Sequence, residues 1–129
     1  MLFRSDHSYQ EDRLRNDWLL LLGSRRDWTT LAEEHIHYRM RDDREVQCSV
    51  SLVEFLRKGP QSDPSLPEEV HRLWMNQREG DEGCAFAADR LYEAGKLSEA
   101  QVWRKARTAA DLGRPKSTRQ AVEIGRAHV

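Results

Sequence analysis

The sequence contains no apolar run long enough to cross a membrane. The run Trp18–Leu22 has only five residues, whereas a membrane-spanning helix needs about 20. The chain also lacks an excess of either charge, because 21 lysines and arginines offset 22 acidic residues and the formal net charge is −1. Such a balance gives no long-range attraction for nucleic acid or for an anionic membrane surface. We therefore expect no membrane partner.

Cysteine is scarce, and the spacings that indicate a metal or phosphate site are missing. Cys48 and Cys84 are the only two cysteines, so no Cys-x-x-Cys pair occurs. The segment Gly80–Gly83 lacks both the lysine and the spacing of a phosphate-binding loop. No signal peptide precedes the cysteines, which favours a reducing cytoplasm. We predict a cytoplasmic protein with free thiols, no metal and no cofactor.

What the sequence does contain is a pattern typical of two helices folded back on each other, between residues 83 and 112. Gly95 supplies the left-handed residue that commonly ends a helix, and Ser98 stands where the next helix would be capped. We expect Trp103 to pack between the two helices. The stripes consist of Phe86, Ala87, Arg90, Leu91 and Ala94 in the first helix and of Ala100, Val102, Trp103, Ala106 and Ala110 in the second.

The remainder of the chain is also predicted to be mainly helical. A helix over Glu11–Leu22 has an apolar face that we place in the core. A second helix begins at Trp28, after the capping residue Asp27. Pro67 occupies the first position of a helix that runs to about Arg78. The face of the first helix is formed by Leu14, Trp18, Leu21 and Leu22.

The length of 129 residues suits one small domain with a modest core. We assign residues 6–123 to that domain, with an N-terminal half at 6–58 and a helical hairpin region at 68–113. Residues 59–67 join them and are rich in glycine, proline and serine, which is typical of a linker. The expected fold is mainly α, a small helical domain with a C-terminal helix hairpin.

Residues 35–52 have two interpretations. Apolar and polar residues alternate on both sides of Asp42 and Asp43, as they would in a β-hairpin. The apolar residues Val46, Val50 and Val53 also follow steps of four and three, which are typical of a helix. We favour a helix for Ser51–Lys58 and keep a β-hairpin over residues 35–52 as the alternative.

Both ends of the chain match the translation of a common short-read sequencing adapter. Leu2–Ser5 is one reading of it after a start codon at Met1, and residues 124–129 are the reading of its reverse complement. We interpret residues 1–5 and 124–129 as adapter translation and expect them to make no contacts with the fold. The remaining residues would then be a fragment of a bacterial gene recovered by metagenomic sequencing.

Two resemblances concern the hairpin region. The stretch Ala88–Ala100 resembles the middle of a tetratricopeptide repeat, because it has the small residue, turn glycine and following alanine of that repeat. Trp103 lies one position early against the aromatic residue of the repeat, and no second copy occurs. The longer stretch Trp74–Leu112 is similar to short helical-hairpin proteins of bacteria. Those proteins share a glycine-acid segment, an alanine-rich helix, an Ala-Gly turn and a tryptophan, found here at residues 80–82, 85–88, 94–95 and 103. This resemblance implies a helix hairpin, and it brings no established activity to this chain.

Few side chains are candidates for catalysis or metal binding. His35, His37 and Cys48 could reach one ion if they lay on strands, because residues two apart share a face there. On a helix the two histidines would point about 160° apart. Cys84 could act as a nucleophile with His71 or Asp81, but a core thiol fits its apolar surroundings better. We expect neither site, and hence a non-catalytic protein.

A basic segment at residues 104–119 is the remaining candidate contact region. It has six cations against one acid, Asp111, and could meet a phosphate backbone or a protein partner. Residues 63–99 are acidic and could instead face it within the fold. The six cations are Arg104, Lys105, Arg107, Arg114, Lys116 and Arg119.

The function that we expect is a non-catalytic helical module for protein interaction or self-association, with an unknown protein partner or a homo-oligomer. The alternative is a nucleic-acid-binding accessory protein that uses residues 104–119. We favour it less because no aromatic residue is interleaved for stacking on bases. We place Trp74 and Trp103 in the core, whereas an exposed tryptophan would mark the site of a partner.

Overall fold

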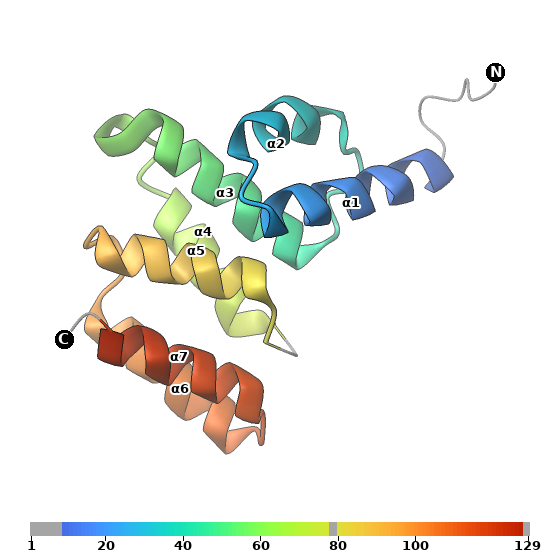
Figure 1. Ribbon diagram of the computed structural model, residues 1–129. Helices are drawn as coiled ribbons and strands as arrows, with labels where there is room; N and C mark the ends of the chain where they lie inside the picture. The colour runs from blue at the N-terminus through green and yellow to red at the C-terminus, as the bar shows by residue number, and fades with distance from the viewer. Residues whose placement is uncertain (1–8, 78–79, 128–129) are drawn as a thin grey trace.

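The computed structural model describes residues 9–77 and 80–127, and it is mainly helical, as predicted (Figure 1). No strand occurs in these two ranges. The helices pack in one body, with α1 and α2 on one side of α3 and the later helices on the other. The elements are α1 (Tyr9–Ser24), α2 (Trp28–Glu34), the 3₁₀ turn η2 (His35–His37), α3 (Arg44–Lys58), the 3₁₀ turn η3 (Gly59–Gln61), α4 (Leu66–Asn76), α5 (Glu82–Glu93), α6 (Glu99–Asp111) and α7 (Pro115–Ala127).

The alternative of a β-hairpin over residues 35–52 is wrong. Asp43 caps α3 by accepting a hydrogen bond from the backbone N–H of Val46 at 3.1 Å. Because α3 contacts α1, α2, α4 and α5, residues around most of its circumference are buried. Burial on opposite sides explains why the apolar residues of this helix also alternate with a period of two.

The core consists of two clusters that share α3. Cys48 and Leu52 belong to the cluster formed with α4, α5, α6 and α7. Val46 and Val53 belong to the cluster formed with α1 and α2. Trp28 packs against both clusters. Helix α3 therefore fixes the position of α1 relative to the rest of the molecule.

Cys48 and Cys84 form a disulfide, so the prediction of free thiols is wrong. The bond joins α3 to α5 across a Cα–Cα distance of 5.0 Å, and both residues are completely buried. The two cysteines lie 36 residues apart in the sequence, and no local spacing indicates that they meet. Only the packing of α3 against α5 brings them together.

The ends of α5 and α6 follow the sequence prediction, but their pairing does not. Gly95 adopts a φ of 77° after α5, and Ser98 forms a capping box with Gln101 at the start of α6. Helix α6 then packs mainly against α7 rather than against α5. The ring of Trp103 lies against Gly125 of α7, where an added Cβ would come within 2.7 Å of it. The placement of Trp103 between α5 and α6 is therefore wrong.

Residues 124–127 are part of the fold. Ile124 belongs to the larger core cluster and Gly125 is buried. The expectation that residues 124–129 make no contacts is wrong for Ile124 and Gly125, which lie on the buried side of α7, whereas Arg126 and Ala127 are exposed. Residues 1–5 and 128–129 lie outside the described residues.

Candidate interaction surface

Helix α1 faces the interior with a mixed stripe of polar and apolar side chains. Asp12, Asn16, Leu19 and Leu22 are buried, at steps of four, three and three residues. This periodicity puts all four on one side of the helix. The two leucines enter the smaller core cluster, while the two polar residues contact the connection between η2 and α3.

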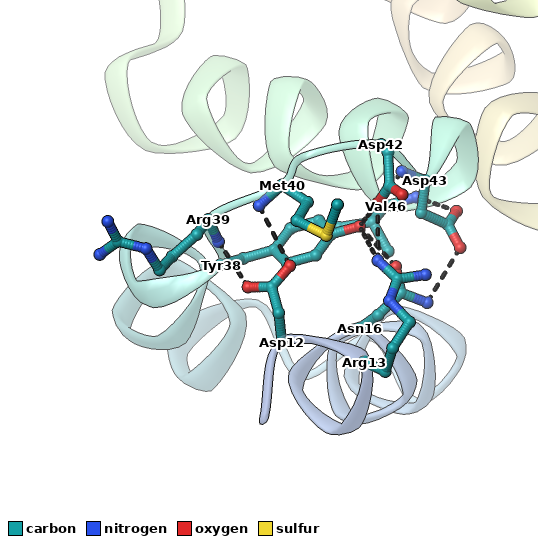
Figure 2. Close-up of polar contacts among 9 residues, drawn as sticks. All are labelled: Asp12, Arg13, Asn16, Tyr38, Arg39, Met40, Asp42, Asp43 and Val46. Carbon is teal, nitrogen blue, oxygen red and sulfur yellow. Dashed lines mark hydrogen bonds and ion pairs between the residues drawn. The ribbon is translucent and has the colours of Figure 1, made fainter. Parts of the chain in front are cut away.

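Asp12 holds this connection through its carboxylate (Figure 2). Its two oxygens accept hydrogen bonds from the backbone N–H groups of Arg39, at 2.7 Å, and of Met40, at 3.0 Å. Both N–H groups thereby gain a hydrogen-bond partner, although neither residue belongs to a helix. The first turns of α1 and the segment that leads into α3 are therefore fixed to each other.

Tyr38 forms the centre of a second polar cluster beside Asp12. Its hydroxyl proton faces two acceptors, Asn16 Oδ1 at 2.5 Å and Asp42 Oδ1 at 2.7 Å. Arg13 donates to the same Asp42 oxygen at 2.6 Å. Burial raises the pKa of Tyr38, and the hydrogen bond from Tyr38 lowers the pKa of Asp42. The hydroxyl thus stays protonated beside a carboxylate, and α1 cannot turn about its axis without breaking these contacts.

Because the inner face is held in this way, a second stripe on α1 points to solvent. Leu14, Trp18 and Leu21 are 66%, 43% and 39% exposed. At steps of four and three residues they lie within about 60° of arc. We define these three residues as the outer stripe of α1. Of the eight large apolar side chains that are exposed in the described ranges, four belong to α1: the three of the outer stripe and Tyr9.

The sequence prediction assigned this stripe to the core, and that assignment is wrong. Leu14, Trp18 and Leu21 were grouped with Leu22, but only Leu22 is buried. Apolar residues occur on two sides of α1, so their spacing alone permits two orientations. The burial of Asp12 and Asn16 decides between them, and a sequence pattern does not reveal that these polar residues have backbone partners at residues 38–43.

Two of the six basic residues predicted to contact a partner serve the fold instead. Lys105 is 2% exposed, and its Nζ donates to the backbone oxygen of Trp74 at 2.6 Å. Arg114 Nη1 donates to the backbone oxygen of Gln77 at 3.0 Å. Both oxygens lie at the end of α4, where helix carbonyls lack partners within the helix and cations are favourable. Burial lowers the pKa of Lys105 to about 8.

The other four basic residues are exposed on α6 and α7: Arg104, Arg107, Lys116 and Arg119. Arg104 borders a hollow of about 640 Å³ along α4, which Glu68 and Glu69 also line. The acidic start of α4 and one of the four exposed cations therefore border the same hollow.

The metal and nucleophile candidates do not assemble into a site. Cys48 and Cys84 are bonded to each other, so neither is a free ligand or nucleophile. Asp81 caps α5 by accepting from the backbone N–H of Cys84 at 2.7 Å, and burial raises its pKa. Within residues 9–77 and 80–127, no group of three or more histidine, cysteine, aspartate and glutamate side chains could hold a metal ion.

Comparison with protein-family models, curated proteins and solved structures gives no match to this chain. In the described part of the chain, none of the helices combines the length and apolar character needed to cross a membrane.

Proposed function

We propose that this chain is a non-catalytic helical module that binds a protein partner, or a copy of itself, through the outer stripe of α1. The observation that carries the proposal is the exposure of Leu14, Trp18 and Leu21 along one side of a helix whose orientation is fixed from within. A single exposed apolar residue is ordinary. Three in a row at helical spacing form the kind of surface that helix-in-groove recognition uses.

Trp18 gives this surface an anchor. Tryptophan is enriched among the residues that dominate binding energy, because one side chain buries a large apolar area at little entropic cost. Leu14 and Leu21 flank it by about one turn on each side. A partner that covers Trp18 would therefore also cover both leucines.

The state of the two cysteines is the evidence for the compartment in which the protein works. The sequence expectation of a reducing cytoplasm agreed with free thiols, whereas a disulfide favours an oxidising environment. Both cysteines are completely buried, which would protect the bond from soluble reductants. A cytoplasmic location therefore remains a prediction that requires this protection.

Nucleic-acid binding through residues 104–119 is the alternative function. Four exposed cations, Arg104, Arg107, Lys116 and Arg119, support it. Lys105 and Arg114 do not, because their side chains donate to the end of α4. Fewer phosphate contacts mean weaker and less salt-sensitive binding. We expect no binding tighter than about micromolar to generic DNA or RNA at physiological salt.

A displayed library of amphipathic helical peptides tests the proposed function. Peptides selected on the purified chain should slow amide hydrogen exchange in α1, and Leu14→Ser or Trp18→Ser should abolish their binding. The matched control is Leu56→Ser, because Leu56 is 47% exposed but lies on α3. A library that gives no binders, or binders that respond to the control and not to the stripe variants, would contradict the proposal.

A further inference from the structure

We propose that the occupant of the outer stripe is a second copy of this chain, docked with its α1 antiparallel to the first. This inference rests on the proposed function and names the partner. It follows from the arrangement of residues along α1, which makes the outer face complementary to itself about one point, Trp18.

A two-fold symmetric dimer uses the same patch on both copies, so the patch must match its own rotated image. Trp18 lies near the middle of the stripe, with Leu14 four residues before it and Leu21 three residues after it. If two such helices run in opposite directions, Trp18 meets Trp18. Leu14 of each copy then lies opposite Leu21 of the other, so every apolar residue of the stripe gains an apolar neighbour.

The charges at the two ends of the same face favour the antiparallel arrangement. Glu11 precedes Trp18 by seven residues and Arg25 follows it by seven, so both lie about two turns from Trp18 on the same side. In the antiparallel pair Glu11 of each copy faces Arg25 of the other. A parallel pair would instead oppose Glu11 to Glu11 and Arg25 to Arg25, which is repulsive.

Arg25 is available for this contact. It lies directly after α1 and is exposed, and its guanidinium takes part in no ion pair among the contacts of the described residues. Glu11 contacts Arg15 at 3.2 Å within the same helix. The Glu11 side chain is 26% exposed, and an ionised carboxylate has about four acceptor positions, so Glu11 can accept from Arg25 of the other copy in addition to the partners that it has in its own chain.

The position of α1 leaves room for a second copy. Helix α1 lies along one edge of the molecule, and its N-terminal half extends beyond α2 and α3 (Figure 1). Three apolar side chains and two ion pairs make a small interface, and interfaces of that size are typical of weak association. We expect a dissociation constant on the order of 10 to 100 µM.

Sedimentation equilibrium tests the dimer over protein concentrations of about 1 to 500 µM. The wild-type mass should rise from that of one chain toward that of two. Leu14→Ser and Trp18→Ser should each weaken association about tenfold or more, while Leu56→Ser should leave it unchanged. Circular dichroism and urea unfolding of each variant separate lost association from lost fold, and Leu14, the most exposed of the three, is the safer substitution.

Charge reversal at low salt tests the orientation, because ion pairs at an exposed rim are strongest there. Glu11→Arg and Arg25→Glu should each weaken the dimer, and the double variant should restore it. A parallel dimer would be insensitive to either single change, so that result would overturn the antiparallel arrangement.

The outcomes separate this inference from the proposed function. A chain that stays monomeric at every concentration overturns the self-association, and peptide binding at the outer stripe would then still support a different protein partner. If neither serine variant weakens the dimer, the interface lies elsewhere, and this result also overturns the inference. A peptide library that gives no binders dependent on the stripe, from a chain that also stays monomeric, is the separate result that counts against the proposed function.

Discussion

Lys105 carries a side-chain amine into the interior of the molecule and contacts the end of α4. Its Nζ donates to the backbone oxygen of Trp74 and lies 5.7 Å from the centre of the Trp74 ring. The partial negative charge at the end of a helix offsets part of the cost of burying a cation. Burial nevertheless dominates, which is why the pKa of Lys105 falls to about 8.

This shift predicts that the free energy of unfolding rises with pH above pH 8. Between the folded pKa of about 8 and the unfolded value of about 10.4, the unfolded chain keeps a proton that the folded chain has released. Stability increases with pH wherever the unfolded state binds more protons. Across this whole pH interval the free energy of unfolding rises by up to roughly 3 kcal/mol. Urea unfolding at pH values from about 7.5 to 9.5 measures the slope below the range in which Tyr38 would titrate.

Two variants test whether Lys105 causes this dependence of the free energy of unfolding on pH. Lys105→Met should remove the rise in stability, because no titrating group then remains at this position. Lys96→Met changes an exposed lysine and should leave the slope as in the wild type. If Lys105→Met shows the same pH dependence as the wild-type chain, the amine is not the group responsible.

At the level of helices, the sequence predicted where elements begin and end better than which sides they bury. Asp27, Ser98 and Gly95 mark helix ends in both the sequence and the structure, because capping depends on neighbouring residues. The buried side of α1 depends on partners at residues 38–43 that are distant in sequence. The outer stripe could not be predicted for that reason, and Trp18 was expected in the core.

The packing of α6 against α7 gives a prediction at the same level. Gly125→Ala would place a Cβ within 2.7 Å of the Trp103 ring, so the two helices must move apart or the ring must shift. We expect a loss of about 1–3 kcal/mol in the free energy of unfolding. In a helix without this contact, the same change stabilises by about 0.5–1 kcal/mol. Urea unfolding measures the difference.

A second variant shows whether the contact is responsible. In a Trp103→Ala background the ring is gone, so Gly125→Ala should become neutral or stabilising there. Additive effects of the two substitutions would mean that Trp103 and Gly125 do not touch. That result would also remove the evidence that Gly125 packs against α6.

For the molecule as a whole, composition and periodicity were enough to predict a mainly helical chain, and the structure confirms this. They were not enough to predict which helices are neighbours. Helices α6 and α7 are consecutive, with only three residues between them, whereas the pairing of α3 with α5 joins side chains that lie far apart in the sequence. The disulfide depends entirely on the pairing of α3 with α5, so an argument from residue spacing could not find it.

That disulfide provides the last prediction. It closes a loop of 36 residues, and the chain-entropy model gives about 4 kcal/mol for a loop of that length, within a usual range of about 2–4 kcal/mol. A reductant strong enough to open the bond in the unfolded chain should therefore lower the melting temperature of the wild type. The variant with both Cys48→Ala and Cys84→Ala should melt at a similarly low temperature and should not respond to the reductant. Thiol titration of the native and the unfolded chain completes the test, because an intact bond leaves no reactive thiol in either. Two thiols per unfolded chain, together with a melting temperature that ignores the reductant, would restore the sequence prediction of free cysteines.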